Sequence, residues 1–162
     1  QTPWVANTLR WHCLLGTRVI AAAGYLETQA EAARLKAIHP TGPDKLCEIP
    51  WGGSSPLGSL GFVDAGGELA AQLASAGVTG PVRVYLPCGT MGSVAGLLIG
   101  LRHAGVPATV VSVKVVPQNV VDASAVLQLA AAIRRLLPAG TAPAMEDLTA
   151  QLEFRTEFAG ES

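Results

Sequence analysis

The sequence predicts an α/β protein in which a parallel sheet carries helices on both faces. Three observations lead to this class. Segments typical of strands and of helices alternate between residues 82 and 137, glycine-rich turns stand where strands give way to helices, and 49% of the residues are hydrophobic while only 14% are charged. An apolar composition suits strands that are buried on both faces, and 162 residues suffice for a sizeable core.

Residues 1–45 predict a helix, a strand and a second helix. The first helix is expected over residues 6–15, with Gly16 at its C-terminal cap. Residues 17–22 are expected to form a strand, and residues 27–38, rich in Ala, Glu, Leu and Lys, a helix. The following HPTGPDK segment, with two prolines and a glycine, is expected to end that helix and to separate two halves of the chain.

A second glycine-rich stretch precedes the next helix. A short apolar segment over residues 46–51 leads into GGSSPLG, in which Ser55 can cap and Pro56 can open a helix that runs to about residue 76. Gly52, Gly53 and Ser54 lie just before this start and are candidates for a ligand-facing loop. A flexible linker followed by a capped helix is the alternative.

Residues 82–137 predict a βαβα unit. Strands are expected over residues 82–87 and over the valine-rich residues 108–116, and helices over residues 93–103 and 121–137. Because a crossover of this length joins parallel strands in a right-handed sense, the sheet should be parallel. The tail from residue 145 is ambiguous between a short helix and a strand around residues 152–158.

The turn between the first strand and helix of this unit has the composition of an anion site. Gly89 and Gly92 allow a tight turn that exposes main-chain N–H groups at a helix N-terminus, and Thr90 and Ser93 add hydroxyl donors. The motif is neither a Walker A sequence nor GxGxxG, which removes the best support for ATP or dinucleotide binding. The alternative is that these glycines only shape a tight βα turn. Further along the helix, Gly96 and Gly100 lie one turn apart and should permit close packing on the sheet.

Charge and hydropathy exclude several classes of function. A net charge of -1 without a basic cluster predicts no positively charged surface for nucleic acid. No apolar run reaches the roughly 18 residues that a membrane span requires, so a soluble protein is expected. Cys13, Cys47 and Cys88 are odd in number and widely spaced, which disfavours a disulfide framework and a structural zinc site and favours a reducing cytoplasm.

Two further chemistries are disfavoured by the spacing of reactive residues. Cys88 stands between a strand and a glycine loop, where a nucleophile could lie, but no His, Asn or Asp can be placed beside it, so a buried apolar role is the preferred interpretation. His12, His39 and His103 fall on separate elements without the spacing of metal ligands, so no metal is expected.

The two glycine-rich segments, in this order, resemble the pyridoxal-phosphate (PLP) dependent D-cysteine desulfhydrase and 1-aminocyclopropane-1-carboxylate deaminase family, whose fold is of the tryptophan-synthase-β type (fold type II). Upstream, ANTLRWHCLLGTRV resembles the family's Asn-Leu-Leu helix and Gly-Ala-x-Val strand. The second segment has diverged from the family's commonest phosphate loop, which reads close to SGGT. The matching positions are Asn7, Gly16 and Val19; Gly52, Gly53, Ser54, Gly58, Gly61, Phe62 and Val63; and Cys88, Gly89, Thr90, Met91, Gly92 and Ser93.

The resemblance implies that residues 88–93 bind the cofactor phosphate, through the amides of Gly89 to Gly92 and the hydroxyls of Thr90 and Ser93. It also implies that residues 1–45 are a remnant of the family's smaller domain, that residues 46–162 belong to the larger domain, that the intact enzyme acts on small amino acids, and that the protein is a homo-oligomer.

The family's catalytic lysine is missing. Neither the Gly-Asn-Lys-x-Arg motif, the Ser-Asn-His element nor the C-terminal Tyr-Thr-Gly-Lys region is present, and Lys36, Lys45 and Lys114 lack the context of a Schiff-base lysine. We therefore assign no catalytic residue and expect a fragment of a PLP-dependent lyase or deaminase that is inactive alone. The alternative is a non-catalytic α/β module that binds phosphate, sulfate or no anion at this loop and self-associates through orphaned apolar surface.

Overall fold

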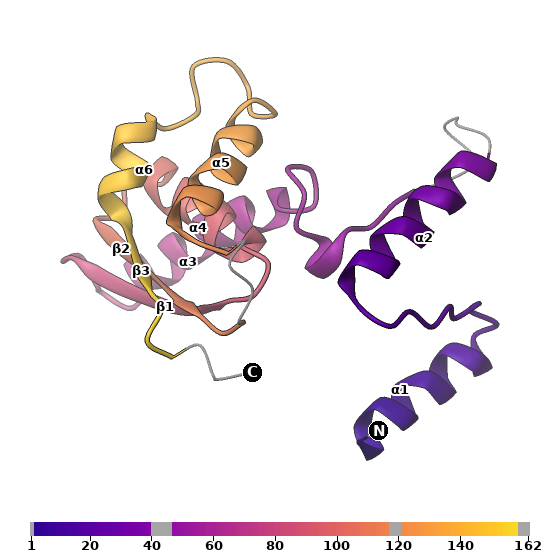
Figure 1. Ribbon diagram of the computed structural model, residues 1–162. Coiled ribbons are helices and arrows are strands. Elements are labelled where there is room, and N and C mark those ends of the chain that lie inside the picture. The colour runs from indigo at the N-terminus through magenta and orange to yellow at the C-terminus, as the bar shows by residue number, and fades with distance from the viewer. Residues whose placement is uncertain (1, 40–46, 117–120, 159–162) are drawn as a thin grey trace. The chain divides into compact units, whose positions relative to one another are not determined.

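The computed structural model describes residues 2–39, 47–116 and 121–158 of the chain. It contains two compact units, Gln1–Glu48 and Ile49–Ser162 (Figure 1). The predictions for the HPTGPDK loop after His39, including Lys45, for Pro117 and for the last four residues lie outside the described residues. The assignment of the two halves to a smaller and a larger enzyme domain stays a prediction.

The first unit contains two helices and no described strand. Helix α1 (Pro3–Leu14) is capped by Thr2, whose hydroxyl accepts a hydrogen bond from the Val5 N–H at 3.5 Å, and α2 is Tyr25–Ile38. Both predicted helices are confirmed, whereas the predicted strand over residues 17–22 is wrong, because this segment has no regular structure. A strand requires a partner, and the described residues of this unit contain no second strand with which it could pair.

The second unit is an α/β unit with a parallel sheet, as predicted. Its three strands lie in the order β1-β2-β3, all parallel, with Val84 opposite Val110 and Ser112 opposite Phe154. Both alternatives for the tail are present, since a short helix leads directly into a strand. The elements are η1 (Trp51–Gly53), α3 (Leu60–Ser75), β1 (Val82–Cys88), α4 (Gly92–His103), β2 (Ala108–Lys114), α5 (Ala123–Arg134), α6 (Met145–Gln151) and β3 (Leu152–Arg155).

Helix α3 begins four residues later than the sequence suggested. Pro56 was expected to open it, but residues 56–59 form a turn and the helix starts at Leu60. The Ser55 hydroxyl accepts a hydrogen bond from the Gly58 N–H at 3.0 Å and so closes this turn instead of capping the helix. Ser59 therefore occupies the cap position of α3.

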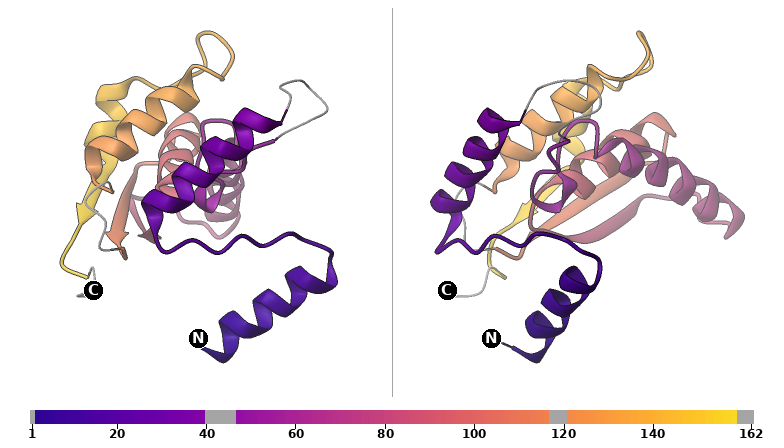
Figure 2. Two further views of the ribbon diagram at one scale, coloured as in Figure 1. Left: turned by 45° about the vertical axis from the view of Figure 1, so that its right-hand side comes forward. Right: turned by 90° about the vertical axis from the view of Figure 1, so that its right-hand side faces the viewer.

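Helix α4 lies at the centre of the core. It contacts α3, α5, α6 and the first two strands, and Val94, Leu98 and Leu101 on it are fully buried. Because α4, α5 and α6 contact one another as well as the strands, they cover the same face of the sheet (Figure 1 and Figure 2). A helix surrounded in this way is apolar on every side, which explains the small and hydrophobic composition of residues 92–101.

Glycines on α4 pack against α3, not against the sheet as predicted. A Cβ atom built on Gly96 would lie 2.4 Å from the Phe62 Cβ, and one on Gly100 would lie 2.1 Å from the Val63 carbonyl oxygen. The spacing of four residues correctly placed both glycines on one face of the helix, but it could not tell which neighbour that face would meet. Since Ser59 and Phe62 lie against the start of α4 and Gly66 lies against Gly100, the two helices run parallel.

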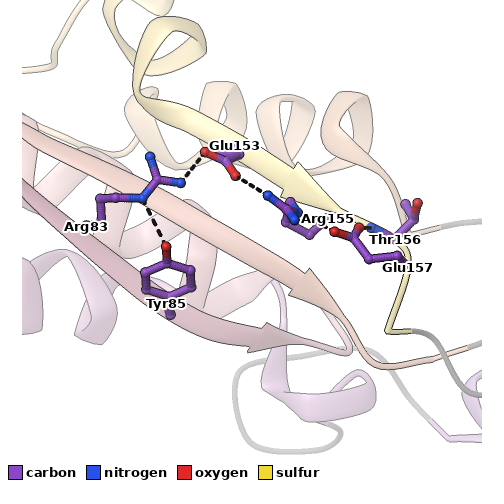
Figure 3. A network of polar contacts seen from close by, with 6 residues as sticks. All are labelled: Arg83, Tyr85, Glu153, Arg155, Thr156 and Glu157. Atoms are coloured by element: carbon purple, nitrogen blue, oxygen red, sulfur yellow. Dashed lines mark hydrogen bonds and ion pairs between the residues drawn. The ribbon is translucent and has the colours of Figure 1, made fainter.

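On the face of the sheet away from these helices, polar side chains and the Tyr85 ring are exposed, whereas Val111, opposite Tyr85 in the register, is fully buried. Along β1 the side chains of Val82, Val84 and Leu86 pack on the core, while Arg83 and Tyr85 point away from it. Arg83 donates to the Tyr85 hydroxyl at 3.0 Å and binds Glu153 of β3, which also binds Arg155 (Figure 3). These hydrogen bonds from Arg83 and Arg155 lower the pKa of the Glu153 carboxyl. The sequence predicted helices on both faces of the sheet, whereas α4, α5 and α6 all lie on one face.

The start of α5 offers a test of local structure. The Asp122 carboxylate accepts a hydrogen bond from the Ala125 N–H at 2.8 Å and so caps the helix. Asp122→Ala should lower the free energy of unfolding by about 1 kcal/mol, because an N–H of the first turn loses its acceptor. Urea denaturation measures this change. Asp122→Asn keeps an acceptor and should stay close to wild type, so equal losses in both variants would contradict the capping role.

Candidate anion-binding site

The candidate site lies where β1 gives way to α4. Met91 precedes the first residue of α4 with a φ of 70°, a left-handed conformation in a residue that is not glycine. The first-turn N–H groups of Ser93 and Val94 have no acceptor among the residues that the structure describes. Helix N-termini carry a partial positive charge and free donors, so this end of α4 is suited to an anion.

The second glycine-rich loop lies against the same helix end. The Ser54 hydroxyl donates to the Thr90 hydroxyl oxygen at 2.8 Å and accepts from the Gly92 N–H at 3.2 Å. Gly52 has a φ of 61°, and a Cβ atom there would lie 2.2 Å from the Thr90 Oγ1. The structure thus brings together two candidate loops that the sequence separates by more than thirty residues.

Ser59 also lies at this place, and the sequence analysis missed it. A Cβ atom built on Gly92 would lie 2.7 Å from the Ser54 Oγ and 3.0 Å from the Ser59 Oγ. Ser59 is 1% exposed, and its hydroxyl has no hydrogen-bond partner among the described residues. The only signal in the sequence was a serine placed just before an apolar helix, and that pattern ordinarily indicates a cap.

The remaining candidates contribute differently. Cys88 is 1% exposed and packs in the core, so only its main chain can face the loop. A Cβ atom on Gly89 would lie 3.7 Å from a Val116 methyl group, an ordinary contact, and Gly53 has a φ of 65°. Ser93 is half-buried in the first turn of α4.

The described part of the second unit contains one lysine, Lys114, and one histidine, His103. Lys36 pairs with Glu48 in the first unit, and Lys114 is half-buried at the carboxyl end of β2, opposite Cys88 in the strand register. The His103 ring nitrogen Nδ1 lies 2.9 Å from the Thr141 carbonyl oxygen. Within residues 2–39, 47–116 and 121–158, no three His, Cys, Asp or Glu side chains form a group that could hold a metal ion.

None of the helices in the described part of the chain is long and apolar enough to cross a membrane.

The left-handed Met91 leads to a stability prediction. An L-residue in this conformation costs about 1–2 kcal/mol, whereas glycine adopts it freely. Both Met91→Gly and Met91→Ala lose the contact of the Met91 side chain with the core. Met91→Gly should therefore be more stable than Met91→Ala by roughly 0.5–1 kcal/mol after the greater chain entropy of glycine is subtracted. Chemical denaturation of both variants measures this difference. Met91→Ala keeps the strained conformation; a Met91→Gly protein less stable than Met91→Ala would contradict the strain.

Comparison with known proteins finds sequence similarity over a part of this chain. No family model matches the chain. It is 38% identical to nocardicin C-9' epimerase of Nocardia uniformis over 73 residues, which are 45% of this chain and 22% of that protein. It is 46% identical to D-cysteine desulfhydrase of Salmonella paratyphi C over 55 residues, 34% of this chain and 16% of that protein. The D-cysteine desulfhydrase of Salmonella newport is 44% identical over 55 residues, again 34% of this chain and 16% of that protein.

The chain therefore matches less than a quarter of the length of these relatives. The likeness to D-cysteine desulfhydrases agrees with the resemblance seen in the sequence motifs, and the likeness to an epimerase was not anticipated. The matched segments establish that a part of this chain is similar in sequence to parts of D-cysteine desulfhydrases and of nocardicin C-9' epimerase.

Proposed function

We propose that residues 49–158 are the phosphate-binding part of a PLP-dependent enzyme of the D-cysteine desulfhydrase type, which acts on small amino acids. The observation that carries this proposal is the N-terminus of α4, where the Ser93 and Val94 amides find no acceptor in the described part of the chain and the Ser54 hydroxyl donates to the Thr90 hydroxyl. The sequence similarity to D-cysteine desulfhydrases supports it.

A phosphate group fits the donors at this helix end. The free first-turn amides would donate to its oxygens, the Thr90 and Ser93 hydroxyls can add two further donors, and the partial positive charge of the helix favours a dianion. When bound, PLP supplies an electron sink for chemistry at the α-carbon of an amino acid. The residues of this chain would hold and orient the cofactor through its phosphate.

The chain alone should have negligible turnover. Lys114 is the one lysine of the described second unit, and its side chain belongs to the end of the valine-rich strand without the family's motif around it. Because the covalent nucleophile typically accounts for many orders of magnitude in rate, a phosphate site without it contributes only binding.

A second candidate is a non-catalytic α/β module that binds an inorganic anion and self-associates. Its support is the exposed face of the sheet, where Tyr85 is 64% exposed and Phe158 is 63% exposed. Apolar groups of this kind on an open sheet are surfaces that a second copy of the chain could cover.

Competition between PLP and inorganic phosphate tests both candidates. The full chain is titrated with PLP, followed by its visible absorbance, and with phosphate, followed by calorimetry. We expect mutual competition, tighter binding of PLP than of phosphate, and no release of sulfide from D-cysteine. Equal affinities for PLP and phosphate would favour the second candidate, and failure of both to bind would reject the anion site.

A further inference from the structure

We propose that the buried hydroxyl of Ser59 is a ligand of the anion at the start of α4. This inference rests on the proposed phosphate site and adds to it a residue that lies outside the glycine loop. Ser59 is 1% exposed, and its Oγ is 3.0 Å from the point where a Cβ atom of Gly92, the first residue of α4, would stand.

The Ser59 hydroxyl makes no hydrogen bond with any described residue. Its main chain is satisfied, because its N–H donates to the Ser55 carbonyl oxygen at 2.9 Å and its carbonyl oxygen accepts from the Phe62 N–H at 3.0 Å. A serine in the cap position normally bonds a first-turn N–H with its side chain. Ser59 makes no such bond, since its φ of -87° and ψ of -7° are helical and not extended.

A buried hydroxyl without a partner destabilises the empty protein, because water is lost and nothing replaces it. Such groups are uncommon in folded proteins and call for an explanation. Here the hydroxyl lies against Gly92, and the amides of the next two residues also lack acceptors among the described residues. One acceptor placed at the end of α4 would satisfy the hydroxyl and the amides together.

The parallel packing of α3 on α4 brings two helix N-termini close to Ser59. Ser59 contacts the region of Gly92 and Gly96, whereas Gly66 contacts Gly100, so the two helices begin at the same end of their interface. Each N-terminus contributes a partial positive charge, and both charges lie near Ser59. This end of the unit therefore suits an acceptor that carries negative charge, and the Ser59 hydroxyl can donate to it.

Opposite effects on stability and on affinity distinguish a ligand from a structural residue. If Ser59 binds the anion, Ser59→Ala removes an unsatisfied group from the empty protein and a hydrogen bond from the loaded one. Without phosphate, the thermal midpoint should stay the same or rise by about 3 °C. The affinity for inorganic phosphate should fall by about tenfold or more, because a hydrogen bond to a charged group is lost.

The experiment measures both quantities on the full chain, by calorimetric titration with inorganic phosphate and by thermal unfolding in its absence. Ser75→Ala is the matched control, because Ser75 lies at the other end of α3 and its hydroxyl only donates to the Ala71 carbonyl oxygen at 2.9 Å. This control should bind phosphate as the wild type does. Ser59→Cys places a weaker donor in a somewhat larger side chain and should bind with reduced affinity; it decides the question if Ser59→Ala does not fold.

Two results would overturn the inference and can be told apart. If the wild type binds phosphate and the folded Ser59 variants bind it equally well, Ser59 is not a ligand, while the proposed phosphate site stands. If the wild type binds no phosphate, both the inference and the proposed site are wrong.

Discussion

Gly66→Ala should destabilise the second unit by about 3 kcal/mol or more, whereas Gly67→Ala should stabilise it by roughly 0.5–1 kcal/mol. A Cβ atom on Gly66 would lie 2.7 Å from the Gly100 Cα and 2.8 Å from the Leu101 nitrogen, and main-chain atoms of a buried helix cannot move aside cheaply. A Cβ atom on Gly67 meets nothing within 4 Å, so only the higher helix propensity of alanine counts there.

Neighbouring positions on one helix thus provide their own control. Urea denaturation of the two variants, followed by circular dichroism, measures the difference of about 4 kcal/mol that these two estimates imply. Gly61→Ala, which also adds a Cβ atom in open space on α3, should resemble Gly67→Ala. Similar stabilities for the Gly66 and Gly67 variants would show that α3 does not pack on α4 through Gly66.

Gly92→Ala should lower the affinity for inorganic phosphate by at least about tenfold, equivalent to roughly 1.4 kcal/mol. The new Cβ atom would lie 2.7 Å from the Ser54 Oγ and 3.0 Å from the Ser59 Oγ, so both hydroxyls must turn away from the helix end. The hydrogen bonds from Ser54 to Thr90 and from Gly92 to Ser54 would then be lost or distorted.

Stability should change much less than affinity in this variant, because alanine is well tolerated in the first turn of a helix and the clashing atoms are the ends of small side chains. Calorimetric titration with phosphate and thermal unfolding provide the two measurements. Gly67→Ala, about two turns along α3 from Ser59, serves as the control for affinity. Wild-type affinity in Gly92→Ala would place any bound anion elsewhere.

Local patterns in the sequence were sufficient for most elements of the second unit. Short stretches of chain contain these signals, namely the β-branched residues of β1 and β2, the glycine loop between β1 and α4, and the small and apolar residues of α4 and α5. For the same reason the sequence identified the loop around Thr90 as a candidate anion site, since exposed amides at a helix start follow from glycine spacing and helix geometry.

Predictions that required a partner were less successful. Residues 17–22 have strand-like composition, but no strand pairs with them in the described part of the first unit. Gly96 and Gly100 were placed on one face of α4, and yet the neighbour of that face proved to be α3. Pro56 was predicted to open α3, but the Ser55 hydroxyl accepts a hydrogen bond from the Gly58 N–H, and residues 56–59 form a turn.

Sequence alone therefore determined the type and order of most local elements, the glycine loop and the lack of a Schiff-base lysine motif in this sequence, because each of these depends on residues close together in the chain. Tertiary packing decided that Ser54 meets Thr90, that Ser59 is buried without a partner beside Gly92, and that α4, α5 and α6 cover one face of the sheet. Burial and hydrogen-bond satisfaction depend on residues that are distant in sequence, and they exist only once the chain has folded.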